Sequence, residues 1–208
     1  MRLLLVPHAA ADVISPDHFQ GWTDSHLTEL GRRQTALLAQ RLLGEKIDAC
    51  HASDLHRAAA TAAVICEPRH LAVASDPRLR ELSFGDWEGL TFREMWDADN
   101  QRANAWQTDP MGIAPPGGET LAQLTERVAA FLAAVTETVR LHYRTVLVVA
   151  HRGSLRVLLC LLLGLPPTKW WEFFLSPASV SELDLFSGGA VLNYLNDTHH
   201  LREAAHAG

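Results

Sequence analysis

The stretch Thr145-Val146-Leu147-Val148-Val149-Ala150-His151-Arg152-Gly153 indicates the fold class of this chain. Its first six residues form a continuous, largely β-branched run, which is typical of a strand buried on both faces of a parallel sheet. A helix is expected immediately afterwards, over residues 153–163, and Gly164 and Pro166 end it. A buried strand that leads straight into a helix is the repeating unit of α/β folds.

The rest of the chain continues this alternation of strands and helices. Strands are expected at residues 3–6, where Pro7 ends the run, at residues 47–52, and in a hairpin whose arms, residues 181–186 and 190–195, flank Ser187-Gly188-Gly189. Helices are expected over residues 28–44 with Thr28 as cap, over 53–66 with Ser53 as cap, from the capping box Thr91-Phe92-Arg93-Glu94, and over 119–142. We therefore predict an α/β three-layer sandwich, in which a mostly parallel central sheet has helices on both faces and an antiparallel hairpin at one edge. No repeat or linker divides the chain, so residues 1–208 are expected to form a single domain.

Composition argues against several classes of function. The 208 residues carry 18 Lys and Arg against 24 Asp and Glu, a formal charge of −6, so we expect no nucleic-acid partner. The longest apolar run, residues 157–165, is far shorter than the roughly 20 residues that cross a bilayer, so no membrane partner is expected. The three Cys are odd in number and far apart, which favours a reducing, cytoplasmic setting. Nothing in the sequence indicates an oligomeric state.

Polar residues follow three of the expected strands, at the edge where ligands of open α/β sheets bind. The first strand is followed by His8, the second by a segment that reaches Arg57, and the third by His151 and Arg152. Two imidazoles and two guanidinium groups beside helix N-termini form a cationic pocket that suits a phosphate dianion. An imidazole in such a pocket can also attack phosphorus and form a covalent intermediate.

Phosphoryl transfer also needs an acid that protonates the leaving alkoxide. Glu81 lies in a Gly-containing loop, residues 79–89, outside any apolar-periodic helix, and is our candidate for this acid. Glu88 is the alternative carboxylate in the same loop, and we interpret it as structural. The remaining histidines have scattered spacings without a His-Glu-x-x-His pattern, so we expect no metal site.

These residues lie in a series of motifs that resembles the phosphoglycerate-mutase-like histidine phosphatase superfamily. The order in that family is a first His after a strand, G-W-x-D-x-x-L-T-E-x-G-x-x-Q, S-D-L-x-R-A-x-x-T-A, L-x-E-x-x-F-G-x-W-E-G, P-G-G-E-[ST], and a second His after a late strand. The corresponding positions here are His8, residues 21–34, 53–62, 79–89 and 116–120, and His151. Each motif is weak alone, but together they are specific and extend over nearly the whole chain.

The resemblance implies a phosphoglycerate-mutase-like fold and a metal-independent phosphatase, without a cofactor, that acts on a small phosphorylated molecule. It implies a phosphohistidine at His8, with Arg57 and His151 binding the transferred phosphoryl group and Glu81 donating the proton. The short chain and residues 151–166 look most like alpha-ribazole phosphatases and small general phosphatases. This likeness makes alpha-ribazole 5′-phosphate a candidate substrate.

The first motif departs from the family pattern. The family normally has Arg-His-Gly there and an Asn six residues after the His, whereas this chain has Pro7-His8-Ala9 and Ile14. Pro7 carries no guanidinium group, so one cation that would hold phosphate is missing. The family's Gly after the second His is Arg152 here, and we hypothesise that Arg152 replaces the lost charge.

Two alternatives to hydrolysis follow from these residues. The loss of Arg and Asn around His8 is compatible with a degenerate family member that binds a phosphorylated ligand without turnover. The family resemblance is also compatible with a mutase of the phosphoglycerate mutase type, which transfers the phosphoryl group between substrate oxygens.

Overall fold

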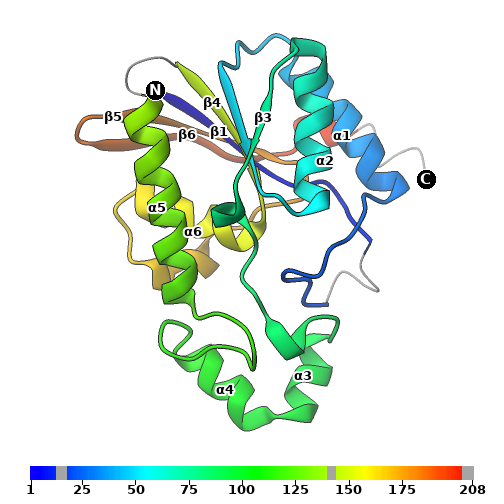
Figure 1. Cartoon of the computed structure of the whole chain (residues 1–208), viewed down its shortest axis with the longest axis vertical. Helices are drawn as coiled ribbons and strands as arrows, with labels where there is room; N and C mark the ends of the chain where they lie inside the picture. Colours follow the sequence, from blue (N-terminus) through cyan, green and yellow to red (C-terminus); the bar gives the residue numbers. More distant parts are fainter. Residues whose placement is uncertain (13–17, 140–143, 203–208) are drawn as a thin grey trace.

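A six-stranded sheet lies at the centre of the computed structural model, which describes residues 1–12, 18–139 and 144–202 (Figure 1). Its strands are β1 (Arg2–Pro7), β2 (Ala49–Ala52), β3 (Val73–Ser75), β4 (Thr145–Ala150), β5 (Val180–Phe186) and β6 (Gly189–Asp197). The order across the sheet is β3-β2-β4-β1-β5-β6. The first four strands in this order pair in parallel, and β5 and β6 add an antiparallel hairpin beside β1. This arrangement confirms the predicted mixed sheet.

Helices cover both faces of the sheet. The α-helices are α1 (Glu29–Leu42), α2 (His56–Cys66), α3 (Phe92–Ala98), α4 (Asn100–Thr108), α5 (Leu121–Val139) and α6 (Arg152–Leu162). Short 3₁₀ helices are η1 (Glu67–Arg69), η2 (Pro77–Leu79), η3 (Gly85–Trp87), η4 (Pro167–Glu172) and η5 (His199–Leu201). In Figure 1, α1 and α2 lie on one side of the sheet and α5 and α6 on the other, while α3 and α4 lie beyond its edge at the bottom.

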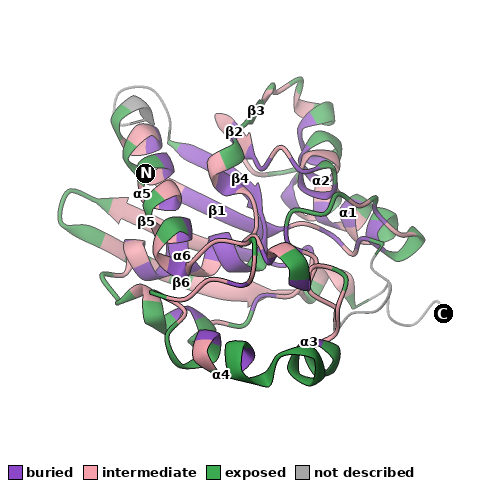
Figure 2. Cartoon of the chain, turned by 60° about the horizontal axis from the view of Figure 1, so that its bottom comes forward, coloured by how far each residue is buried: buried purple, intermediate pink, exposed green. Residues whose placement is uncertain are grey.

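The alternation of side chains along β1 explains the three layers. Leu3 and Leu5 pack into the core cluster that α5 and α6 complete, whereas Leu4 and Val6 pack into the cluster that contains α1 and α2. All four side chains are buried, because successive residues of a strand point to opposite faces and both faces are covered. In Figure 2, the central strands are accordingly purple, and the outer surface of α3 and α4 is largely green. Within the described residues, no helix is long and apolar enough to cross a membrane.

The structure corrects the predicted start of α2. We expected Ser53 to cap it, but α2 begins at His56, and its N-cap residue, Leu55, makes no capping hydrogen bond through its side chain. The backbone N–H of His56 donates instead to Oδ1 of Asp24, at 2.9 Å. A carboxylate from a distant loop therefore takes the capping role at this end of the helix, and the hydroxyl of Ser53 has another partner.

Two elements were not predicted. Strand β3 has only three residues, and two of them are exposed, so its sequence carries no apolar pattern. Helix α4 is polar on most of its surface and buries only Ala103 and Trp106. The predicted end of the long helix at His142 lies outside the described residues.

Candidate active site

The carboxyl ends of β1, β2 and β4 bring His8, Ser53 and His151 together. The backbone N–H of His8 donates to the carbonyl of Ala150 at 2.9 Å, and the N–H of Ser53 donates to the carbonyl of Val149 at 3.0 Å. The ends of β1 and β2 therefore flank the end of β4. The two imidazole rings lie with their centroids 5.1 Å apart.

His8 is held with one ring nitrogen free. Its Nδ1 lies 2.8 Å from the backbone carbonyl of Ala9, which accepts only if Nδ1 carries the proton. This tautomer leaves the lone pair on Nε2. Burial, together with the nearby cations Arg57 and Arg152, lowers the pKa of His8 to about 3, against a backbone hydrogen bond that raises it. His8 is therefore a neutral imidazole near pH 7, the form in which it can act as a nucleophile.

His151 is fully buried, and its tautomer follows from Ser53. His151 Nε2 lies 2.8 Å from Oγ of Ser53, and the same oxygen accepts the backbone N–H of Leu55 at 3.3 Å. We assign the hydroxyl proton of Ser53 to the hydrogen bond with Nε2, which places the ring proton of His151 on Nδ1. Nδ1 has no hydrogen-bond partner among the described residues. Burial and the neighbouring His8 and Arg57 lower the pKa of His151 well below its usual value, so it too is neutral.

Arg57 lies in the first turn of α2 and is completely buried. Its guanidinium group donates to the carbonyls of Thr23 at 2.9 Å and Gly21 at 2.6 Å, while its Nε has no partner within the described chain. Burial lowers the pKa of Arg57, and the nearby carboxylates of Glu81, Asp24 and Glu88 oppose this shift. Glu88 holds the loop that supplies the two carbonyls, because its carboxylate accepts the backbone N–H groups of Trp22 and Thr23.

A cavity of about 540 Å³ opens beside His8. Arg152 is exposed and lines this cavity together with His8 and Glu81, and Arg156 lies one helical turn further along α6 in the same wall. Arg152 therefore shares the cavity with His8, and the replacement of the lost charge at position 7 stays a prediction. Ile14, the other departure from the family pattern, lies outside the described residues.

Glu81 lies in the cavity wall opposite the start of α6. Its Oε1 accepts the backbone N–H of Leu82 at 2.8 Å, and its Oε2 accepts the N–H of Gly153 at 3.1 Å. Gly153 permits this approach because a Cβ at that position would come within 2.0 Å of the Glu81 carboxylate. The sequence at the start of α6 therefore determines how closely the carboxylate approaches the first turn of this helix.

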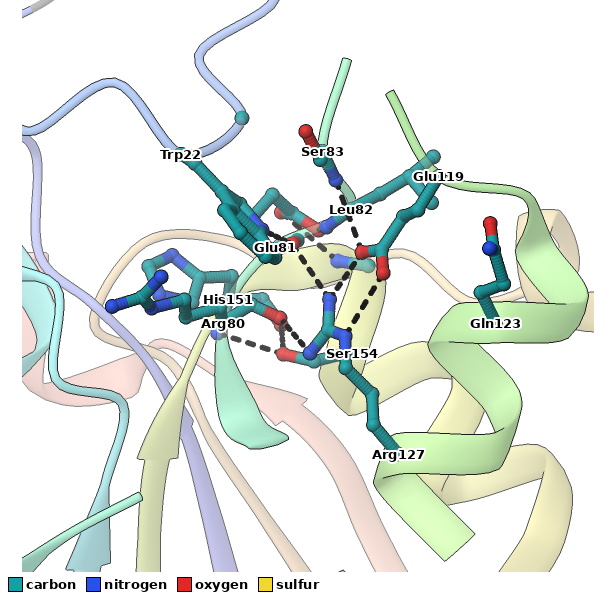
Figure 3. Close-up of polar contacts among 12 residues, drawn as sticks. Trp22, Arg80, Glu81, Leu82, Ser83, Glu119, Gln123, Arg127, His151 and Ser154 are labelled. Carbon is teal, nitrogen blue, oxygen red and sulfur yellow. Dashed lines mark hydrogen bonds and ion pairs between the residues drawn. The ribbon is translucent and has the colours of Figure 1, made fainter. Parts of the chain in front are cut away.

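An ion pair between Glu119 and Arg127 holds the segment that carries Glu81 (Figure 3). Arg127 Nη2 lies 2.5 Å from Glu119 Oε1 and also donates to the carbonyl of Glu81 at 2.7 Å. Its Nη1 donates to the carbonyls of Arg78 and Arg80, at 2.8 and 2.7 Å. Glu119 accepts the backbone N–H of Ser83 at 3.1 Å. The pair thus binds backbone groups on both sides of Glu81 and holds the backbone of Glu81 in place.

The sequence analysis named His8, Arg57, Glu81, His151 and Arg152, and the structure places all of them at this end of the sheet. It missed the contact between Ser53 and His151, and the role of Arg127. Arg127 lies in α5, whereas Glu119 lies in the loop before it, so their pairing depends on how that loop folds back, and helical spacing did not indicate it. Within the described residues, there is no group of three or more His, Cys, Asp or Glu that could hold a metal ion.

Comparison with known proteins identifies the family. The profile of the histidine phosphatase superfamily (branch 1) matches residues 3–198. The chain belongs to this superfamily. This histidine phosphatase is 34% identical over 203 residues to phosphoserine phosphatase 1 of Hydrogenobacter thermophilus, a match that covers 98% of this chain and 95% of that protein.

Two further relatives carry the name of another phosphatase. The chain is 33% identical over 196 residues to the adenosylcobalamin/alpha-ribazole phosphatase of Escherichia coli (strain K12), with 94% of this chain and 96% of that protein covered. The structure of the alpha-ribazole phosphatase from Shigella flexneri matches with a TM-score of 0.88 at 31% identity, over 95% of this chain and 96% of that one. The histidine phosphatase described here is therefore a phosphatase with the phosphoglycerate-mutase-like α/β fold, and its family acts on small phosphorylated substrates.

Proposed function

We propose that this histidine phosphatase hydrolyses monoesters of small metabolites, without a metal ion, through a phosphohistidine on His8. Alpha-ribazole 5′-phosphate is a candidate substrate because two relatives bear its name. The observation that carries the proposal is the state of His8. Its imidazole is neutral, has its lone pair on Nε2, and lies beside Arg57, His151 and Arg152 at a cavity.

In the first step, Nε2 of His8 attacks phosphorus, and the bond from phosphorus to the ester oxygen breaks. Arg57 and Arg152 supply positive charge to the phosphoryl oxygens, where negative charge is concentrated. His151 is neutral but donates through its Nδ1–H, which Ser53 leaves free of other partners. The leaving oxygen takes its proton from Glu81.

In the second step, water attacks the phosphohistidine. Glu81, now a carboxylate, accepts a proton from that water, and the bond between phosphorus and Nε2 breaks to release inorganic phosphate. Glu81 can serve in both steps only if it stays near the reacting oxygen. The hydrogen bonds from Arg127 to its backbone and from Gly153 to its side chain support such a fixed position.

Trapping the intermediate tests the proposal. With p-nitrophenyl phosphate as substrate and a strong chelator present, we expect continuous release of nitrophenol and inorganic phosphate. Rapid quenching in alkali, which preserves phosphohistidine, should then recover up to about one phosphate per protein chain. Mass spectrometry should locate this phosphate on His8. Turnover that stops with the chelator and returns with added metal would overturn the metal-independent mechanism.

The same assay separates the two alternatives. A degenerate binder would bind inorganic phosphate or a monoester but give neither nitrophenol nor a labelled histidine. A mutase would transfer the phosphoryl group to a second hydroxyl group of a phosphorylated primer, so that labelled phosphate appears in the isomeric ester rather than in solution. Release of free phosphate as the main product supports the hydrolase.

Removing Arg152 tests whether it replaces the missing cation. We expect Arg152→Ala to lower kcat/KM for a phosphate monoester by about 10- to 100-fold, the usual cost of one charge-assisted contact. The double variant Pro7→Arg/Arg152→Ala, which returns the family's own cation, should regain a large part of this loss. The matched control is Arg33→Ala, which removes an exposed cation on α1 away from the cavity. Equal kcat/KM in Arg152→Ala and the unmodified protein would contradict the replacement.

A further inference from the structure

An aromatic pocket adjoins the cavity at His8. This second cavity, of about 300 Å³, is lined by Phe19, Phe92, Trp106, Gln107, Pro110 and Trp171. Phe19, Phe92 and Trp171 also line the cavity beside His8, so the two spaces share a wall. Five of the six lining residues are apolar, and Gln107 is the exception. We call this second space the aromatic pocket.

The walls of the aromatic pocket come from separate elements that pack through ring contacts. Trp106 on α4 contacts the rings of Phe19 at 6.2 Å and Trp171 at 6.3 Å, both edge-on. Trp106 is nearly fully buried, whereas Phe92 and Trp171 are 46% and 55% exposed. Large rings left this exposed beside a reactive centre are typical of a surface that a ligand covers. Arg156 extends the same wall, with its guanidinium carbon 5.6 Å from the ring centre of Trp171.

A small zwitterionic alcohol would leave the aromatic pocket unfilled. The serine part of phosphoserine carries a carboxylate, which the cations of this wall can attract, and an ammonium group, which needs an anion or several acceptors. Within the described lining of the two cavities, Glu81 is the one carboxylate, and both of its oxygens already accept backbone N–H groups. Arg152 and Arg156 add positive charge to the same wall. Serine has no apolar group that could fill the aromatic pocket, so this pocket gives phosphoserine no advantage over an ester that carries a ring.

From these observations we infer that the aromatic pocket binds an aromatic ring system carried by the alcohol part of the substrate. This inference rests on the proposed phosphatase function and assigns its substrate class. The phosphoryl group occupies the cationic end at His8, and the ring lies among Phe92, Trp106 and Trp171. Monoesters of ring-bearing alcohols are then favoured over phosphoserine.

A pair of esters isolates the contribution of the ring. Propyl phosphate and 3-phenylpropyl phosphate both release a primary alcohol of similar acidity, so their chemistry at phosphorus is alike. We expect the phenyl ester to have the higher kcat/KM by about 10- to 100-fold, the effect of burying one ring. The ratio of the two constants should fall toward one in Trp171→Ala and in Phe92→Ala. The control is Phe186→Ala, an exposed ring at the end of β5 outside both cavities, which should leave the ratio unchanged.

Binding measurements keep this test separate from the proposed activity. Calorimetry with His8→Ala, which cannot form the phosphohistidine, should give the same preference for 3-phenylpropyl phosphate over propyl phosphate and over phosphoserine. If the unmodified protein turns over neither ester, the proposed function fails. The ratio of the dissociation constants of the two esters still tests the inference about the aromatic pocket. Two results would contradict the inference. In the first, propyl phosphate and phosphoserine bind and react as well as the phenyl ester. In the second, Trp171→Ala and Phe92→Ala both keep the kcat/KM ratio of the unmodified protein, so the aromatic pocket does not bind the ring.

Discussion

Replacement of His8 by alanine should reduce turnover of p-nitrophenyl phosphate by about 10⁴-fold or more. The reason is that Nε2 of His8 forms the bond to phosphorus in the first step. His151 is neutral as well, but its Nε2 faces Ser53. The measurement is steady-state release of nitrophenol together with alkaline trapping of the phosphoenzyme, which should vanish in the variant.

The control for this variant is His199→Ala. His199 is exposed in η5 and does not line the cavity, so its replacement should change turnover by less than about twofold. Far-ultraviolet circular dichroism would show whether His8→Ala remains folded, which we expect because the side chain only partly fills a cavity wall. Undiminished turnover in His8→Ala would refute the phosphohistidine mechanism.

Replacement of Glu81 by glutamine should produce the second-largest loss, and this loss should depend on the leaving group. Nitrophenolate leaves without protonation, whereas a simple alkoxide must be protonated as it leaves. We therefore expect Glu81→Gln to lower kcat/KM, which reports the first step, by about 10²- to 10³-fold for propyl phosphate but by less than about tenfold for p-nitrophenyl phosphate. A plot of log kcat/KM against the pKa of the leaving alcohol should be steeper in the variant.

Glu88→Gln is the matched comparison for Glu81→Gln. Glu88 lies in the same loop but accepts the N–H groups of Trp22 and Thr23, so it supports the segment that positions Arg57. Its replacement should affect fast and slow leaving groups alike. If Glu88→Gln shows the steeper plot and Glu81→Gln does not, the assignment of the acid is reversed.

Arg127 offers a further check on the same acid. Because it donates to the backbone carbonyl of Glu81, Arg127→Met should give a weaker form of the same leaving-group dependence. The double variant with Glu81→Gln should add little, since Arg127 acts through Glu81. A purely structural role would instead lower kcat equally for all esters and add fully in the double variant.

The sequence analysis predicted the elements whose signal is local. Residues 3–6 and 146–150 are continuous apolar runs, and they lie in β1 and β4 in the middle of the sheet, where both faces are covered. The capping box at Thr91 and the cap at Thr28 are present as expected, because each depends on residues within one helical turn. The ends of the same two apolar runs predicted that His8 and His151 follow strand ends, where α/β sheets bind ligands.

The order of motifs along the chain also predicted the residues of the candidate site. It could not predict how they are oriented. Ser53 looked like a helix cap, since a serine before an alanine-rich helix is a common signal, yet its hydroxyl pairs with His151, 98 positions away. Strand β3 and helix α4 went unseen because neither has an apolar period to detect.

The sequence by itself thus determined the fold class, the strand ends that carry His8 and His151, and the missing cation at Pro7. Tertiary structure alone decided the sheet order, with β4 inserted between β1 and β2, and therefore the 5.1 Å approach of the two imidazoles. It also decided that Arg152 faces the cavity and that Arg127 holds the segment of Glu81. The physical reason is that these contacts join residues far apart in the chain, whereas caps and periodic faces depend on near neighbours.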